Sequence, residues 1–151
     1  MTDKTRLPIV LLGIVAGGMI YGGVSVIAGY FAPVTAVIAG FFGGSGLAIY
    51  DRRLDAGDTD VSVVALVLYC ICGIIALIIG YYIIYNFAEI PISMLGNVRL
   101  IHPNNPSMYP SFPGFMAATI SIPTIICIIL GSTLCAAGMK RLVHALARTR
   151  E

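Results

Sequence analysis

Four long apolar runs dominate this sequence and restrict what the chain can fold into. They cover residues 7–31, 34–50, 61–85 and about 115–139, and none of them contains Asp, Glu, Lys, Arg or His. A helix rising about 1.5 Å per residue needs roughly 20 apolar residues, within a usual range of ~17–25, to cross the hydrocarbon core of a bilayer. The residues are 58% hydrophobic and 11% charged, whereas soluble domains are about 25% charged. We therefore predict an all-α integral membrane protein with four transmembrane helices in a single domain, residues 1–151.

The connections between the runs differ in length and chemistry. A very short turn at Ala32 and Pro33 joins the first two runs, a polar segment at 51–60 follows the second, and a basic tail at 140–151 follows the fourth. The segment 86–114 is the one long connection and contains five prolines. The first run exceeds the 7–15 residues typical of a signal-peptide core, so we expect it to be retained as a span.

Basic residues are distributed unequally between the two sides. Arg99 is the only one of the nine Lys and Arg residues that falls in segment 86–114; the other eight flank the runs at the N-terminus, in segment 51–60 and in the C-terminal tail. Cytoplasmic segments of membrane proteins carry the excess of Lys and Arg. The asymmetry predicts that both termini face the cytoplasm and that segment 86–114 faces outward.

Small residues repeat every four positions in the first two runs. Such spacing lets two helix backbones approach closely in a bilayer, where the hydrophobic drive between helices is weak. We predict that the first two spans form a glycine-packed antiparallel hairpin, of the kind called a glycine zipper. Its packing residues are Gly13, Gly17, Gly18, Gly22, Ala36, Gly40, Gly44 and Ala48.

The first run has two such stripes, one more than a single neighbouring helix requires. Gly13 and Gly17 begin one stripe, and Gly18 and Gly22 form the other. Three interpretations stay open: the second and third spans both pack there, one stripe faces another protein, or a lipid, quinone or pigment tail lies in the groove.

No constellation of residues indicates catalysis or metal binding. Ionisable residues within spans commonly mark proton relays and ion paths, and these runs have none. Four cysteines lie within the runs and are interpreted as small apolar packing residues. His102 and His144 fall on opposite predicted sides, so they do not form a shared metal site. We therefore expect no enzyme activity, no metal and no cofactor, with a bound lipid as the one ligand left open.

The segment 86–114 is predicted to be a docking element on the outer side. Its 29 residues exceed the ~12–15 above which a loop without function or disorder is uncommon, and its composition is too apolar for a solvated tail. The candidate residues for contact with a partner are Glu89, Arg99, His102 and Tyr109. The alternative is a lid folded over the chain's own helices.

The segment "MKRLVHALARTRE" is predicted to continue the fourth helix past the bilayer. Its basic residues suit anionic headgroups of the inner leaflet, where each contributes on the order of 1 kcal/mol. An acidic partner surface is the competing interpretation, and nucleic acid is not expected with so few basic residues.

Two function classes follow from these observations. The first is a non-catalytic accessory or structural subunit of a larger membrane complex, for example of respiratory, photosynthetic or membrane-oxygenase type, whose partners are other membrane subunits and the bilayer. The second is a small homo-oligomeric transporter, channel or lipid-handling protein. The predicted location is a prokaryotic cell membrane as a multi-pass protein, with an organelle inner membrane as the alternative.

Overall fold

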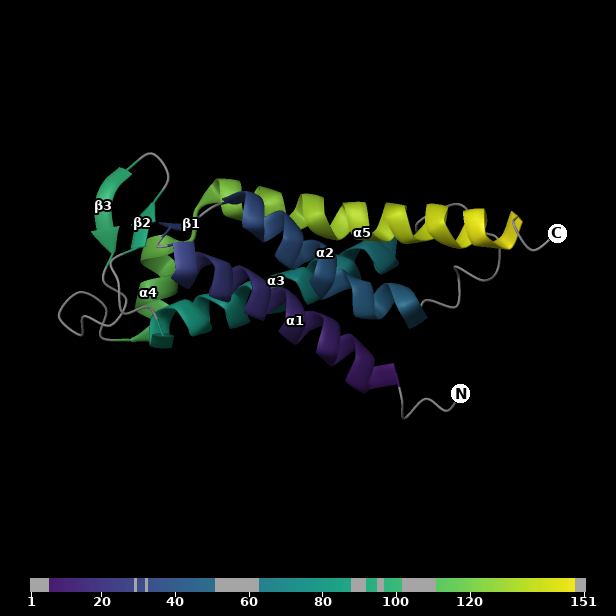
Figure 1. Ribbon diagram of the computed structural model, residues 1–151, viewed down its shortest axis with the longest axis horizontal. Coiled ribbons are helices and arrows are strands. Elements are labelled where there is room, and N and C mark those ends of the chain that lie inside the picture. Colours follow the sequence, from purple (N-terminus) through teal and green to yellow (C-terminus); the bar gives the residue numbers. More distant parts are fainter. Residues whose placement is uncertain are drawn as a thin grey trace.

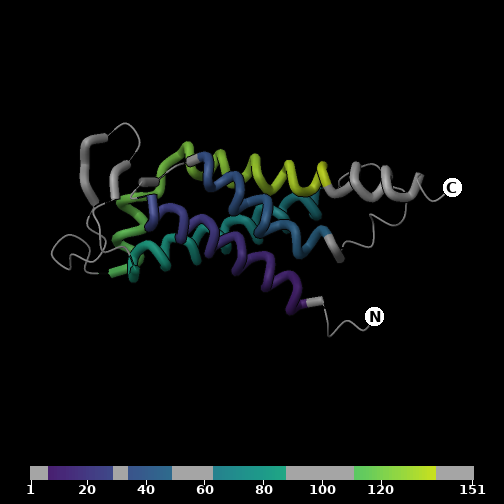
Figure 2. Tube along the Cα trace, in the orientation of Figure 1, coloured from purple at the N-terminus to yellow at the C-terminus, as the bar shows by residue number. Residues whose placement is uncertain are grey.

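The computed structural model describes residues 6–28, 30–31, 33–50, 63–87, 92–94, 97–101 and 111–148 (Figures 1 and 2). Side chains are described within 7–28, 34–48, 63–87 and 111–138. The elements are five helices and three short strands.

Four long helices run along the molecule and alternate in direction (Figure 1). They are α1 (Arg6–Ala28), α2 (Pro33–Tyr50), α3 (Val63–Phe87) and α5 (Ile122–Arg148). Their predicted counterparts begin and end within a few residues, except at the fourth run. Both ends of the described chain therefore lie at one end of the bundle, and the strands lie at the other.

The helices α2 and α3 form the centre of the bundle. Each of them packs against α1, against α5 and against the other. Helices α1 and α3 run in the same direction, and so do α2 and α5, as their paired contacts show. This arrangement gives α2 close neighbours on three sides.

The fourth run departs from the prediction of a single helix over about 115–139. It forms a short helix α4 (Phe112–Thr119) and the long helix α5, which meet at an angle of 90°. Ile120 has an extended backbone (φ −66°, ψ 128°) that ends α4. Ser121 accepts a hydrogen bond from the Thr124 amide (3.4 Å) at the start of α5, and Pro123 fits the first turn of a helix because no N–H is needed there. The break therefore lies just before the proline, and α4 crosses the end of the bundle (Figure 1).

A small sheet occupies the same end, in segments for which the sequence pattern predicted no strand. Strand β1 (Tyr30–Phe31) follows α1, while β2 (Ile92–Met94) and β3 (Asn97–Ile101) lie within segment 86–114. β1 pairs with β2 in parallel, and β2 pairs with β3 antiparallel. Because Tyr30 and Phe31 join this sheet, α1 ends at Ala28 instead of reaching residue 31.

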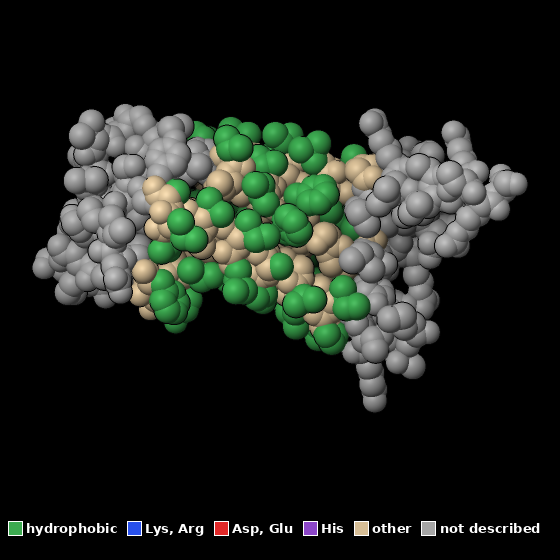
Figure 3. Space-filling model, in the orientation of Figure 1, with side chains coloured by type: hydrophobic (Ala, Val, Ile, Leu, Met, Phe, Trp, Pro, Cys, Tyr) green, Lys and Arg blue, Asp and Glu red, His purple; other side chains and the backbone are tan. Residues whose placement is uncertain are grey.

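The surface of the bundle is suited to lipid. In the part whose side chains are described, α1 and α3 are long and apolar enough to cross a membrane, and α4 with α5 makes a third candidate if the bent pair counts as one span. The described stretch of α2, Val34–Ala48, is shorter. Hydrophobic side chains cover much of the visible face (Figure 3). The exposed large hydrophobic residues include Ile27, at 88% exposure. The predicted helices are thus confirmed, and two or three of them are long and apolar enough to cross a membrane. Four crossings and their orientation stay predictions.

Candidate functional site

The two glycine stripes of α1 contact two different helices of the same chain. A methyl group built on Gly13 would lie 2.9 Å from the Gly46 amide nitrogen of α2, and one on Gly17 would lie 2.7 Å from the Ala39 carbonyl oxygen. Gly18 and Gly22 instead approach the backbone of α3. Of the three interpretations left open by the sequence, the structure shows the first, in which the second and third spans both pack on α1.

The predicted stripe on α2 faces a different helix from the one expected. Gly40 lies against the Ile128 carbonyl oxygen of α5, and a methyl on Gly44 would lie 2.9 Å from the Tyr69 ring of α3 and 3.4 Å from the Cys135 sulfur of α5. Ala36 and Ala48, at the ends of the stripe, belong to buried clusters that include residues of α5. The expected pairing of this stripe with the first span is therefore wrong, because α5 and α3 occupy that side of α2.

Helices α1 and α2 still form an antiparallel pair, but with other residues of α2. Gly46 lies against Ile9 and Val10 of α1, while Gly43 packs on both α1 and α3. Gly131, which lies outside the predicted stripes, meets the backbone of Val37. Its signal in the sequence was a lone glycine within an apolar run, which does not identify a partner.

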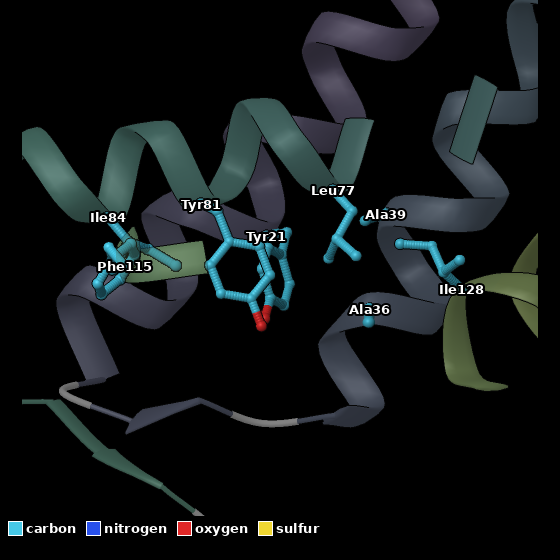
Figure 4. Packing of buried hydrophobic residues seen from close by; sticks show 8 residues of the cluster. All are labelled: Tyr21, Ala36, Ala39, Leu77, Tyr81, Ile84, Phe115 and Ile128. Carbon is cyan, nitrogen blue, oxygen red and sulfur yellow. The ribbon is translucent and has the colours of Figure 1, made fainter. Parts of the chain in front are cut away.

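A buried cluster lies where α1, α2, α3, α4 and α5 meet near the sheet end (Figure 4). Tyr21 and Tyr81 have ring centroids 5.7 Å apart, and Tyr81 and Phe115 have theirs 6.1 Å apart. All three side chains are almost completely buried. Aromatic pairs in such tilted arrangements add about 0.5–1.5 kcal/mol beyond the burial of their surface.

The tyrosine hydroxyls form a hydrogen-bonded chain that ends at the break before α5. Tyr21 bonds to Tyr81, and Figure 4 shows their two oxygens close together. The Tyr81 hydroxyl donates in turn to the Thr119 carbonyl oxygen (3.5 Å). In an uninterrupted helix this carbonyl would accept from residue 123, but Pro123 has no N–H to donate. Tyr81 therefore replaces a helical hydrogen bond that the proline removes.

Three further hydroxyls surround this corner. Ser121 and Thr124 bond to each other through their side-chain oxygens (2.8 Å), and Thr124 also bonds to Tyr81. Ser25 lies one turn beyond Tyr21 on α1 and is fully buried, and its Oγ has no hydrogen-bond partner. Apart from Ser25, the hydroxyls described here have hydrogen-bond partners. They and the backbone groups neither titrate near neutral pH nor act as strong nucleophiles without a base.

An aromatic clamp joins the end of α3 to the start of α4. Its members are Tyr82, Tyr85, Phe112 and Phe115, whose rings contact across the two helices with centroids 5.4 to 5.8 Å apart. Ser111 caps α4 by accepting from the Gly114 amide (3.4 Å). The clamp therefore fixes the two points between which segment 88–110 extends.

Three of the four docking candidates, Glu89, His102 and Tyr109, lie outside the described residues. Arg99 lies in β3, where the backbone alone is described. Across the described ranges, no group of three or more His, Cys, Asp or Glu could hold a metal ion. Cys72 and Cys135 are buried in the helix contacts, and Cys70 and Cys127 are partly buried.

No protein-family model, curated protein or solved structure matches the chain.

Proposed function

We propose that the chain is a non-catalytic structural subunit of a larger membrane complex and that segment 86–114 is the element that docks a neighbouring subunit. The observation that carries this proposal is the anchoring of that segment to the bundle. Strand β2 pairs with β1, which directly follows α1, and the aromatic clamp holds the start of α4 against the end of α3.

Anchoring matters because binding by a loose segment costs conformational entropy. Ordering costs about 0.5–1.5 kcal/mol for each flexible side chain, in addition to the backbone. A segment whose strands are paired and whose ends are fixed loses less when it binds. This supports docking, whereas a freely solvated connection of the same length would not favour it.

The helical core supports a structural role in a second way. Its helices meet at backbone distance through Gly17, Gly40 and Gly131, and its described side chains include no ionisable Asp, Glu, Lys, Arg or His. Such contacts favour a rigid body. A rigid body of this kind supports a structural role, because close helix packing through small residues stabilises a fixed shape in the bilayer.

The test is to replace residues 97–108 with a Gly/Ser linker of equal length and to identify the proteins that copurify in mild detergent. The expected result is loss of the partner subunits while the helical bundle keeps its thermal stability. The matched control replaces residues 52–59 in the other polar connection with the same type of linker and should retain the partners. Partners retained at full stoichiometry after the 97–108 replacement would contradict the proposal.

Single substitutions refine the same test. Arg99→Ala and Tyr109→Ala remove residue types that often dominate binding energy at interfaces. If either side chain contacts the partner, its removal should lower the amount of copurified partner. Glu89→Ala and His102→Ala report whether the other two candidates contribute.

A second candidate, a small homo-oligomeric transporter, channel or lipid-handling protein, is favoured by the break between α4 and α5. Discontinuous helices with polar groups at the break are typical of transporter binding sites, and Tyr81, Ser121 and Thr124 lie at this one. Purification as a homogeneous oligomer of this chain alone would favour that candidate over the subunit proposal.

A further inference from the structure

The last two turns of α5 extend past the rest of the bundle. A contact at Gly44 places Tyr69 and Cys135 at one level along the bundle axis. Helix α2 ends six residues after Gly44, and α3 begins six residues before Tyr69, so both ends are level with residue 141 of α5. The helix continues to Arg148, which adds about 10 Å at 1.5 Å per residue. Figure 1 shows this projection of α5 beyond its neighbours.

The whole of α5 matches the full thickness of a bilayer rather than its hydrocarbon core alone. Its 27 residues span about 40 Å, whereas the core is about 30 Å thick and the bilayer with its headgroups about 40–45 Å. With Ile122 at one edge of the core, the turns after residue 141 fall in the headgroup layer on the opposite side.

The basic residues of these turns share one side of the helix. At about 100° per residue, Lys140, Arg141, His144 and Arg148 lie within a sector of about 100°, which we call the basic face. Leu142, Val143 and Leu146 fall on the opposite side. The helix beyond the bundle is therefore amphipathic by position.

The basic face lies in line with the lipid-exposed side of the same helix. Ile126, Leu130 and Ala137 are exposed, and the positions 126, 130, 137, 141, 144 and 148 follow one another at intervals of 3, 4 or 7 residues, which keeps them on a single stripe. The opposite side of α5, with Ile128, Ser132 and Cys135, is buried against α2 and α3. The basic face thus continues the side of α5 that is exposed to lipid tails between residues 126 and 137.

We propose that the basic face of α5, formed by Lys140, Arg141, His144 and Arg148, binds the headgroups of anionic phospholipids in the adjacent leaflet. A lipid whose tails lie along Ile126, Leu130 and Ala137 has its headgroup at the level of these residues. Basic side chains also extend toward headgroups while their aliphatic parts stay against apolar surface. An acidic protein and the aspartates of segment 51–60 are the other conceivable occupants of the basic face. Segment 51–60 joins α2 to α3, and both helices pack on the side of α5 opposite to the basic face.

The experiment uses the absence of tryptophan from this chain. The variant Ala137→Trp introduces one fluorescent probe on the stripe next to the basic face, and Ile122→Trp introduces a matched probe at the far end of the same helix. Each full-length variant is reconstituted into vesicles of phosphatidylcholine and phosphatidylglycerol, with bromine on the tails of one lipid or the other. Quenching by each brominated lipid measures the local preference for phosphatidylglycerol.

The expected result is a preference for phosphatidylglycerol at Ala137→Trp and none at Ile122→Trp. Adding Arg141→Gln and Arg148→Gln should reduce the preference about fivefold for each charge removed. The control pair Lys4→Gln and Arg6→Gln removes the same charge near the N-terminus and should leave the preference unchanged. Circular dichroism and gel filtration establish that each variant remains folded.

Two results would overturn the proposal. Equal quenching by both lipids at Ala137→Trp would show that the basic face has no preference for anionic headgroups. A preference that appears only after Asp55, Asp58 and Asp60 are changed to Asn would show that the chain's own acidic segment covers the face.

Discussion

Replacing Gly131 by alanine should weaken the contact between α2 and α5 more than any change of similar size elsewhere on α5. The methyl group would meet three backbone atoms of Val37: the carbonyl oxygen, the carbonyl carbon at 2.8 Å and the Cα at 3.0 Å. Ordinary contacts of a Cβ lie at 3.4–4 Å. Backbone atoms cannot rotate aside as a side chain can, so the two helices have to separate by roughly 0.5–1 Å.

The cost follows from what that separation removes. A radial gap of about 0.5–1 Å forfeits a quarter to a half of the attraction at each contact, and the separation extends along the seam that includes Gly40 and Gly44. Overpacking of a well-filled core typically costs about 1–3 kcal/mol. Alanine also favours the helix by up to ~1 kcal/mol over glycine, which offsets part of the loss.

The matched control is Gly138→Ala, two turns later on the same helix, where a methyl group would have nothing within 4 Å. Both variants receive the same gain in helix propensity, so their difference isolates the packing cost. We expect Gly131→Ala to be less stable than Gly138→Ala by about 2 kcal/mol, measured by reversible unfolding in mixed micelles or by steric trapping in bilayers. Equal stability of the two variants would refute the assignment of Gly131 to a backbone contact.

Three other predictions follow from the structure. Tyr81→Phe should cost about 1 kcal/mol because it removes the bonds to Tyr21, to Thr124 and to the Thr119 carbonyl. Tyr82→Phe, at a side chain that is 55% exposed, should be neutral in the same unfolding assay. Ser25→Ala should leave stability unchanged or raise it by up to ~1 kcal/mol, since the buried Ser25 hydroxyl has no partner. The control Ser132→Ala removes a bond to the Ile128 carbonyl (2.9 Å) and should lower stability. A clear loss of stability in Ser25→Ala would contradict the prediction. Asn104→Cys should react with a membrane-impermeant maleimide on intact cells and Gly57→Cys should not, and reversal of the two would contradict the predicted orientation.

The positions of the helices could be predicted from the sequence because bilayer-length apolar runs leave few alternatives. The predicted spans 34–50 and 61–85 differ from Pro33–Tyr50 and Val63–Phe87 by at most two residues at each end. The fourth span was harder to predict, since the run 115–139 is apolar throughout and its single internal proline, Pro123, does not by itself distinguish a kink from a break. Ser121 two residues before that proline was the available signal, because serine is a favoured N-cap and proline is favoured in the first turn.

The sheet could not be predicted for a different reason. Strand β1 has two residues and β2 has three, so neither is long enough to show an alternating pattern. Their pairing depends on α1 ending beside segment 86–114, which is a property of the folded bundle. The same holds for the aromatic clamp: Tyr82, Tyr85 and Phe112 were visible as residues near a predicted boundary, but only the return of the chain through α4 brings them together.

The glycine-rich stretch of α2 shows why small-residue spacing does not identify a partner helix. Gly40 contacts α5, Gly44 contacts α3 and α5, Gly43 contacts α1 and α3, and Gly46 contacts α1. A helix with one close neighbour needs small residues on one side, whereas α2 lies between three helices and needs them on three sides. Read as a single stripe, the spacing of four from Ala36 to Ala48 fits any of these neighbours equally well. The density of glycine in 40–46 therefore reflects the central position of α2. Both stripes of α1 likewise contact helices of the same chain. For this reason we base the docking proposal on segment 86–114 and not on a glycine stripe.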